Sequence, residues 1–221
     1  MTAAQKAYRG MAMEGVIATW YTKNTGRDLR RFTDMAQTVA SRTPAGARIL
    51  EVAPGPGYLS IELAKRGYRV TALDISKSFV RITQENAAAA GVSLDVRLGN
   101  ASAMPLPDAS FDFIVCSAAF KNFSDPIGAL NEMHRALAPG GQASIFDLRK
   151  DARPDEIDAE VRHMRTSPVN AWMTRLTFRL MLLKSAYTRA EIERMAAATR
   201  FGGCQIDKSG VGFELRLIKA G

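Results

Sequence analysis

The fold of this chain is decided between residues 49 and 57, where the sequence reads Ile49-Leu50-Glu51-Val52-Ala53-Pro54-Gly55-Pro56-Gly57. An apolar run that carries one acid favours a buried strand, and the two glycines around a proline favour a tight turn directly after it. Residues 58–67 then show helical spacing and end on Gly67. A strand that turns on glycines into a helix exposes bare backbone N–H groups, so we predict a site for a nucleotide-like cofactor.

Alternating strand and helix patterns continue to about residue 150. Ser76 is placed to cap a helix that runs to Gly91, and Asp125-Pro126 supplies a cap and a first-turn proline for residues 127–137. Such alternation predicts a parallel sheet with helices on both faces. The predicted strands of this part are residues 48–52, 69–72, 93–98, 111–116 and 142–146.

The last 70 or so residues follow a different pattern. Ser167-Pro168 predicts the start of an apolar-rich stretch, residues 169–184, and Thr188 with Glu191 predicts a capping box for a helix that stops at residues 202–203. Two further strand candidates, residues 204–208 and 212–219, are joined so briefly that they must be antiparallel.

We therefore predict an α/β fold with a doubly wound, mostly parallel sheet of seven strands, the last of them antiparallel, with helices on both faces and a helical cap. The whole chain, residues 1–221, is expected to form a single domain. Within it we expect N-terminal helices (1–45), a cofactor-binding core (46–150), a cap insertion (151–187) and a last helix with two strands (188–221).

Composition and charge exclude several classes of protein. Cys116 and Cys204 lack the spacing of a disulfide framework or a zinc site, so a reducing cytoplasmic location is the simplest expectation. No stretch reaches the 18 apolar residues of a spanning helix. The net charge of +8 resides at the two ends of the chain, since residues 49–150 carry ten basic and ten acidic side chains. Without a dense basic run, this balance favours an ordinary surface over nucleic-acid binding.

The identity of the cofactor is addressed by the glycine pattern. A fingerprint for binding a nicotinamide dinucleotide needs a third glycine, which the sequence lacks after Gly57. An acid inside the strand, such as Glu51, has no evident role in a site of that kind. Residues 51–57 instead match an acid followed by G-x-G-x-G, except that Ala53 replaces the first glycine. With Asp74 at the end of the second strand and Gly99-Asn100-Ala101 in place of G-D-A, the sequence resembles a class I S-adenosylmethionine (SAM)-dependent methyltransferase. The similarity is to the small-molecule and ubiquinone/menaquinone C-methyltransferase-like group.

The resemblance implies a role for each matching residue. Asp74 is expected to accept hydrogen bonds from the ribose hydroxyls, for which an ionised carboxylate is suited. Asn100 is expected to accept from the adenine amino group, with Ile75 and Met104 as apolar walls of the adenine site. The cofactor-binding residues predicted in this way are Glu51, Ala53, Pro54, Gly55, Gly57, Asp74, Ile75, Asn100, Ala101 and Ser117.

The acceptor side of the site is less defined by the sequence. Methyl transfer from a sulfonium needs alignment above all, and the catalytic residues remain unassigned. Neither His134 nor His163 is expected to act as a general base. Lys121 could act as one only if burial lowered its pKa. Asp147 has no acidic partners, so we expect no metal. The residues predicted to face a substrate are Trp20, Tyr21, Phe120, Lys121 and Trp172.

We therefore predict an enzyme that uses SAM to transfer a methyl group to a small, largely apolar molecule by in-line displacement. The cap, with Arg175 and Arg179 four residues apart, is compatible with ordinary packing, with a lid, or with peripheral membrane contact. The alternatives are a nicotinamide-dependent oxidoreductase, a SAM-binding protein without catalysis, and an RNA-modifying methyltransferase. The acceptor atom and the oligomeric state are not determined by the sequence.

Overall fold

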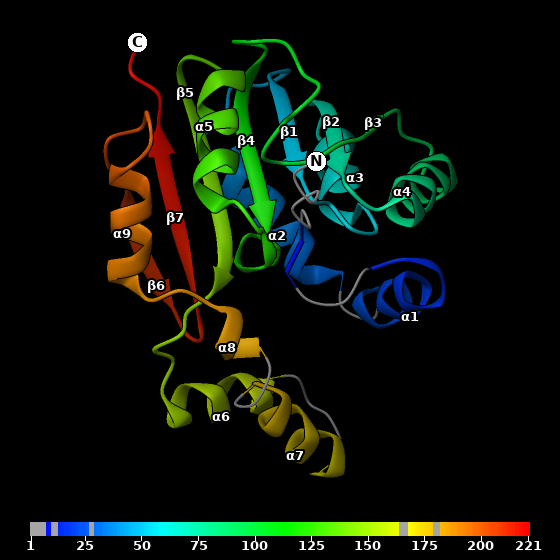
Figure 1. The fold of residues 1–221 in the computed structure, drawn as a ribbon. Helices are drawn as coiled ribbons and strands as arrows, with labels where there is room; N and C mark the ends of the chain where they lie inside the picture. The colour runs from blue at the N-terminus through cyan, green and yellow to red at the C-terminus, as the bar shows by residue number, and fades with distance from the viewer. Residues whose placement is uncertain (1–7, 10–12, 27–28, 164–167, 179–181) are drawn as a thin grey trace, which may run out of the picture.

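The computed structural model describes residues 8–9, 13–26, 29–163, 168–178 and 182–221, and within them seven strands form one open sheet (Figure 1). The strand order is β3-β2-β1-β4-β5-β7-β6, in which β7 runs antiparallel to both neighbours and the other pairs are parallel. This confirms the predicted fold class. The strands are β1 (Arg48–Val52), β2 (Arg69–Asp74), β3 (Asp95–Leu98), β4 (Phe111–Ser117), β5 (Leu137–Leu148), β6 (Gln205–Ser209) and β7 (Gly212–Ile218).

Helices cover both faces of the sheet and extend beyond the carboxyl ends of its parallel strands. In Figure 1, α6 and α7 lie below these ends, and α1 lies to one side of them. The helices are α1 (Gly15–Thr25), α2 (Arg30–Ala40), α3 (Tyr58–Lys65), α4 (Lys77–Ala89), α5 (Pro126–Ala136), α6 (Pro154–His163), α7 (Pro168–Thr177), α8 (Leu183–Ser185) and α9 (Arg189–Ala197), with a 3₁₀ turn η1 (Phe120–Asn122).

The alternation of side chains along β1 fixes which helices pack on which face. Ile49 is buried in a cluster with residues of α2 and α3, whereas Leu50 and Val52 belong to the cluster that contains α5 and α9. A strand buried on both sides in this way reads as a continuous apolar run, which is what residues 49–52 show around Glu51.

The predicted helix starts are confirmed. The Ser76 hydroxyl accepts the N–H of Phe79 at 3.1 Å, and Asp125 accepts the N–H of Gly128 at 2.8 Å. Thr188 begins α9 with both hydrogen bonds of a capping box. These caps satisfy N–H groups that have no partner within their helices, and so they fix where each helix begins.

Two predicted boundaries differ from the structure by five residues, and several others by one or two. The strand expected to start at residue 142 starts at Leu137, because the loop at residues 138–141 is itself paired: the Gly140 N–H donates to Lys219 and the Lys219 N–H to Gly141. The helix expected to run to residue 202 ends at Ala197, where the Thr199 hydroxyl donates to a carbonyl of the last turn. The apolar stretch 169–184 is divided between α7 and α8. Met11, Ser167 and Arg179 lie outside the described residues.

Candidate functional site

The turn after β1 has a left-handed backbone at every second residue. Ala53, Gly55 and Gly57 have φ angles of 56°, 57° and 78°. At Gly57 glycine is required by space as well, because a Cβ there would lie 2.5 Å from the Cγ2 of Thr83. Ala53 adopts the conformation that glycine favours in spite of its Cβ, at a cost of about 1–2 kcal/mol. The position at which the sequence departs from the family pattern therefore keeps the backbone geometry of that pattern.

Helix α4 holds this turn through two side chains that were not predicted. The Thr83 hydroxyl donates to the carbonyl of Gly55 at 2.7 Å, and the Asn86 amide donates to the carbonyl of Pro56 at 2.9 Å. The two residues are three apart and therefore share one face of the helix. Polar residues at this spacing, on the same helix face as the buried Phe79 and Ile82, were the sequence feature that could have indicated this contact.

Asp74 lies at the carboxyl end of β2 and contacts the turn directly. Its carboxylate accepts the N–H of Gly55 at 3.1 Å and the N–H of Ser76 at 2.9 Å, and the residue is 5% exposed. Burial raises the pKa of Asp74 to about 6, against the lowering effect of these hydrogen bonds. A carboxylate has about four lone-pair sites, so two remain for hydroxyl donors such as those of a ribose.

Glu51, the acid within β1, faces α3. Its carboxyl accepts the hydroxyl of Ser60, the residue is 2% exposed, and burial raises its pKa to about 7. Because its partner is a helix side chain, a direct contact between Glu51 and a cofactor stays a prediction. Its observed contacts join β1 to the helix that follows the turn.

The residues predicted for the adenine side follow β2 and β3. Ile75 is 42% exposed and Met104 is buried, so the former offers an accessible apolar surface. The side-chain oxygen of Asn100 already accepts the N–H of Ser102 at 3.0 Å, but an amide oxygen has a second lone pair. Pro54 is buried, while Ala101 and Ser117 are half-buried.

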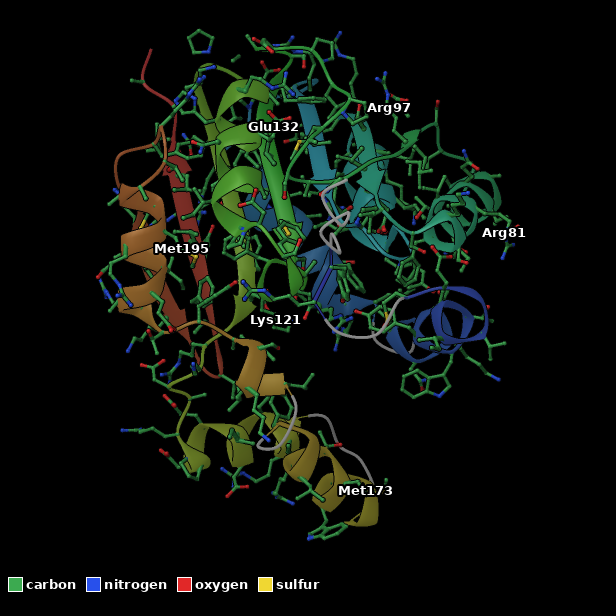
Figure 2. All side chains as sticks on the ribbon, viewed as in Figure 1. Arg81, Arg97, Lys121, Glu132, Met173 and Met195 are labelled. Atoms are coloured by element: carbon green, nitrogen blue, oxygen red, sulfur yellow. The ribbon has the colours of Figure 1, made fainter. Side chains whose placement is uncertain are left out.

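Beyond the end of β4, Lys121 forms a buried ion pair with Asp147. The ammonium is 2.8 Å from a carboxylate oxygen of Asp147 and donates to the carbonyl of Ala118, and the Lys121 N–H donates to the same carboxylate. Figure 2 shows Lys121 at the carboxyl end of the sheet, between β4 and α8. The fixed ammonium argues against a general base. Asp147, expected after strand five, lies inside β5.

The aromatic residues predicted to face a substrate have different surroundings. Phe120 has no exposed surface and packs against Phe123 and Tyr187, so in this structure it belongs to the core. Trp20 and Trp172 are 65% and 63% exposed, on α1 and α7. Tyr21 packs edge-on against Phe79 with ring centroids 5.8 Å apart and lies beside Gly55. Of the set, Tyr21 adjoins the turn.

Two described residues of the N-terminal segment contact elements at the carboxyl edge of the sheet. Glu14 accepts the N–H groups of Lys77 and Ser78 at the start of α4, while the backbone of Arg9 donates to the carbonyl of Asn122 at 2.7 Å. Burial, together with the charges of Tyr21, Asp74 and Asp147, raises the pKa of Tyr8 to about 12. Tyr8 was not predicted, and its antiparallel bridge to Phe123 depends on tertiary packing.

Other candidate groups lie elsewhere. His134 lies on α5, away from the turn, and packs edge-on against Phe201. Among the described residues, no three His, Cys, Asp or Glu side chains are grouped so that they could hold a metal ion. In the same part of the chain, every helix is too short or too polar to cross a membrane.

A mostly parallel sheet with a glycine turn after its first strand, and an acid at the end of its second, is typical of Rossmann-like proteins that bind a nucleotide-type cofactor. Residues 50–145 match the family model described as a methyltransferase domain. The surrounding fold is similar to that of solved structures described as SAM-dependent methyltransferases. A structure from Methanococcus maripaludis, provisionally assigned to these enzymes, has a TM-score of 0.76 over 96% of each chain at 21% identity.

Curated relatives match part of the chain. The demethylmenaquinone methyltransferase of Thermus thermophilus is 35% identical over 128 residues, which cover 56% of each chain. A ubiquinone biosynthesis O-methyltransferase of Xanthomonas axonopodis is 32% identical over 108 residues, covering 48% of this chain and 45% of its own. The chain thus spans about half the length of the curated relatives that it matches.

Proposed function

We propose that this protein binds SAM at the glycine turn and transfers the methyl group to a small, largely apolar molecule of the quinone type. The observation that carries the proposal is the Asp74 carboxylate, held 3.1 Å from the Gly55 N–H at the carboxyl edge of the sheet. Ligands of open α/β sheets bind at this edge, where the strand order reverses, and here the order reverses between β1 and β4.

Each part of the turn has a role in this proposal. Gly55 and Gly57 let the cofactor approach the backbone, Asp74 accepts from the ribose hydroxyls, and Ile75 supplies an apolar wall for the adenine ring. SAM supplies an electrophilic methyl group with its own leaving group. The protein therefore needs chiefly to align the acceptor and exclude water.

The choice of acceptor is supported by the side chains near the site and by the relatives. Tyr8 and Tyr21 bring aromatic side chains to this edge, which suits an apolar ring. The relatives are named for menaquinone and ubiquinone methylation, one of them explicitly at oxygen. We propose residues 151–187 as the cap over this site. The cytoplasmic location inferred from the cysteines stays a prediction.

Thermal shift separates SAM binding from the nicotinamide alternative. SAM and S-adenosylhomocysteine are each expected to raise the melting temperature of the protein, since only ligands of the native state do so. The Asp74→Ala variant should stay folded and lose this shift, while Asp34→Ala, which removes an exposed acid of α2, should keep it. A shift with NAD alone, or an unchanged SAM response in Asp74→Ala, would contradict the proposal.

A transfer assay separates catalysis from binding alone. Methyl-labelled SAM is incubated with the full chain and a panel of demethylated quinols, phenols and a structured RNA. Label in a quinol or phenol is the expected result. A SAM-induced thermal shift without transfer to any acceptor would indicate a SAM-binding protein, and transfer to RNA alone would indicate the nucleic-acid alternative.

A further inference from the structure

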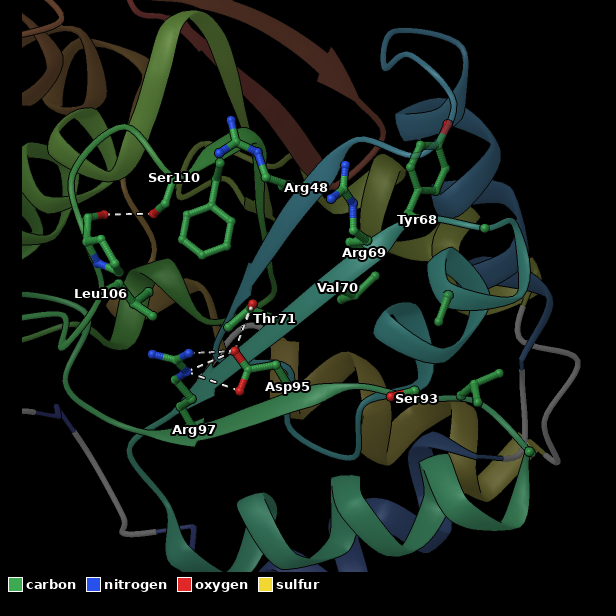
Figure 3. Close-up of a pocket in the computed structure, with 16 residues that line it drawn as sticks. Arg48, Tyr68, Arg69, Val70, Thr71, Ser93, Asp95, Arg97, Leu106 and Ser110 are labelled. Carbon is green, nitrogen blue, oxygen red and sulfur yellow. Dashed lines mark hydrogen bonds and ion pairs between the residues drawn. The ribbon is translucent and has the colours of Figure 1, made fainter.

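A second pocket lies at the opposite edge of the sheet from Asp74. It has a volume of about 720 Å³ and is lined by the beginnings of β1, β2 and β4, by β3 and by the loops beside them (Figure 3). Arg69 and Asp74 stand at the two ends of β2, five residues apart, which in an extended strand is roughly 16 Å. The end of the pocket at Arg69 is therefore remote from the proposed SAM site, and the volume of the pocket is in the range of small-molecule sites.

Two arginines meet at one end of this pocket. Arg48 and Arg69 are direct partners in the register of β1 and β2, and both line the pocket (Figure 3). Strand spacing places the backbones of such partners about 5 Å apart, and like charges on paired residues are unfavourable unless an anion compensates them.

Of the two, only Arg48 is hydrogen-bonded to a carboxylate in the part of the chain that the structure describes. This carboxylate, that of Asp112, also interacts electrostatically with Arg69. Asp112 accepts from the Nε of Arg48 at 3.2 Å, from its terminal nitrogen at 2.6 Å and from its backbone N–H at 2.8 Å. Arg69 has a single side-chain hydrogen bond among the described residues, from Nε to the carbonyl of Gly46 at 3.2 Å. Since a guanidinium has five donors, its outer edge retains four that face no acceptor of the described chain.

The remainder of the pocket is electrically balanced and partly apolar. At the far end, Arg97 pairs with Asp95, which also accepts the hydroxyl of Thr71. The walls between the two ends include Val70, Leu106 and Phe111, all buried. The lining holds three arginines against one aspartate, so the pocket combines an excess of positive charge with apolar walls.

We propose that this pocket binds a small, partly apolar molecule that bears an oxyanion, either a phosphate monoester or a carboxylate. The guanidinium fork of Arg69 matches two oxygens of such a group. Arg48 adds a second positive charge beside it, and the apolar walls accommodate the rest of the ligand. The proposal does not depend on the reaction at the other edge of the sheet.

Isothermal titration calorimetry of the full chain tests this with four probes: 1-naphthyl phosphate, 1-naphthoate, 1-naphthol and inorganic phosphate. The two naphthyl anions are expected to bind, and the tighter one identifies the preferred oxyanion. Naphthol lacks the charge and should bind about tenfold or more weakly than the anions, as expected for the loss of one charged contact. Inorganic phosphate keeps the charge but lacks the ring, and should also bind about tenfold or more weakly because it buries no apolar surface.

The matched variants are Arg69→Gln and Arg81→Gln. The latter removes an exposed arginine of α4 outside the pocket, where it pairs with Glu85. Arg69→Gln should raise the Kd of the preferred anion about tenfold, and Arg81→Gln should leave it unchanged. Arg69→Lys, which keeps the charge without the fork, should give an intermediate Kd and also serves if Arg69→Gln proves unstable.

Several results would overturn the inference. Equal Kd values for wild type and Arg69→Gln would remove Arg69 from the site, and equal losses in both glutamine variants would indicate a general effect of net charge. Binding of naphthol as tightly as the anions would exclude charge recognition. Displacement of the anions by S-adenosylhomocysteine would place them in the other site. Tighter binding of a single-stranded oligonucleotide, with both glutamine variants equally impaired, would indicate a nucleic-acid surface.

Discussion

The buried carboxyl of Glu51 makes the stability of this protein depend on pH in a predictable way. Burial raises its pKa from 4.5 to about 7, although Ser60 donates a hydrogen bond to it. The folded-state pKa lies above the ordinary value. The stabilisation from the protonated carboxyl is therefore complete below pH 4.5 and is lost as the pH rises through 7.

The Glu51→Gln variant removes this titration and keeps an oxygen that can accept from Ser60. The raised pKa corresponds to about 3 kcal/mol in all, of which about 2.5 kcal/mol develops between about pH 5 and pH 8. Glu51→Gln should therefore gain about 2.5 kcal/mol on the wild type over this interval. With a urea m value of about 2 kcal/mol/M, the difference between their midpoints should change by roughly 1 M.

Urea unfolding of both proteins at several pH values measures the effect, because other titrating groups cancel in the comparison. Glu62→Gln is the control on α3, since Lys65 and Arg66 lower the pKa of Glu62 and its contribution changes only under more acidic conditions. Free energies of unfolding that stay parallel for wild type and Glu51→Gln between about pH 5 and pH 8 would refute the assignment of a strongly raised pKa.

Three further predictions concern the same framework. Gly57→Ala should lower the free energy of unfolding by about 1–3 kcal/mol, because the new Cβ meets the Thr83 methyl. In this background Thr83→Ser, which keeps the hydroxyl but not that methyl, should recover part of the loss in urea unfolding; no recovery would mean that the clash is not the cause. Lys121→Met should lower the free energy of unfolding by about 3–5 kcal/mol in urea unfolding, because it leaves Asp147 buried without its cation. The double variant Lys121→Met/Asp147→Asn should lose less, and an equal loss in the single and double variants would contradict this explanation. Thr188→Ala should cost about 1 kcal/mol in thermal or urea unfolding through loss of the capping box, and an unchanged stability would show that the cap is dispensable.

The parts of the site that were predicted are those encoded by neighbouring residues. The glycine turn after residues 49–52, the cap at Ser76 and the acid at the end of the second strand each depend on short stretches with strong conformational preferences. Ala53 was noted as a departure from the family pattern, and its left-handed backbone could not be read from the residue type, because alanine favours other conformations.

The remaining features depend on which elements pack together. Phe120, which was predicted to face a substrate, is fully buried. The 3₁₀ turn that contains it packs on Tyr187, a residue distant in the sequence. Lys121 was weighed as a base, and its ion pair with Asp147 joins residues 26 positions apart. No local pattern reports such pairings.

The sequence by itself determined the order of the elements and the position of the glycine turn, because glycines, caps and apolar periodicity act over a few residues. Only the tertiary structure decided that Asp74 bonds to Gly55, that Thr83 and Asn86 fix the turn, and that Arg48 faces Arg69 across two strands. Strand register and helix packing set these contacts, and both depend on the fit of distant segments.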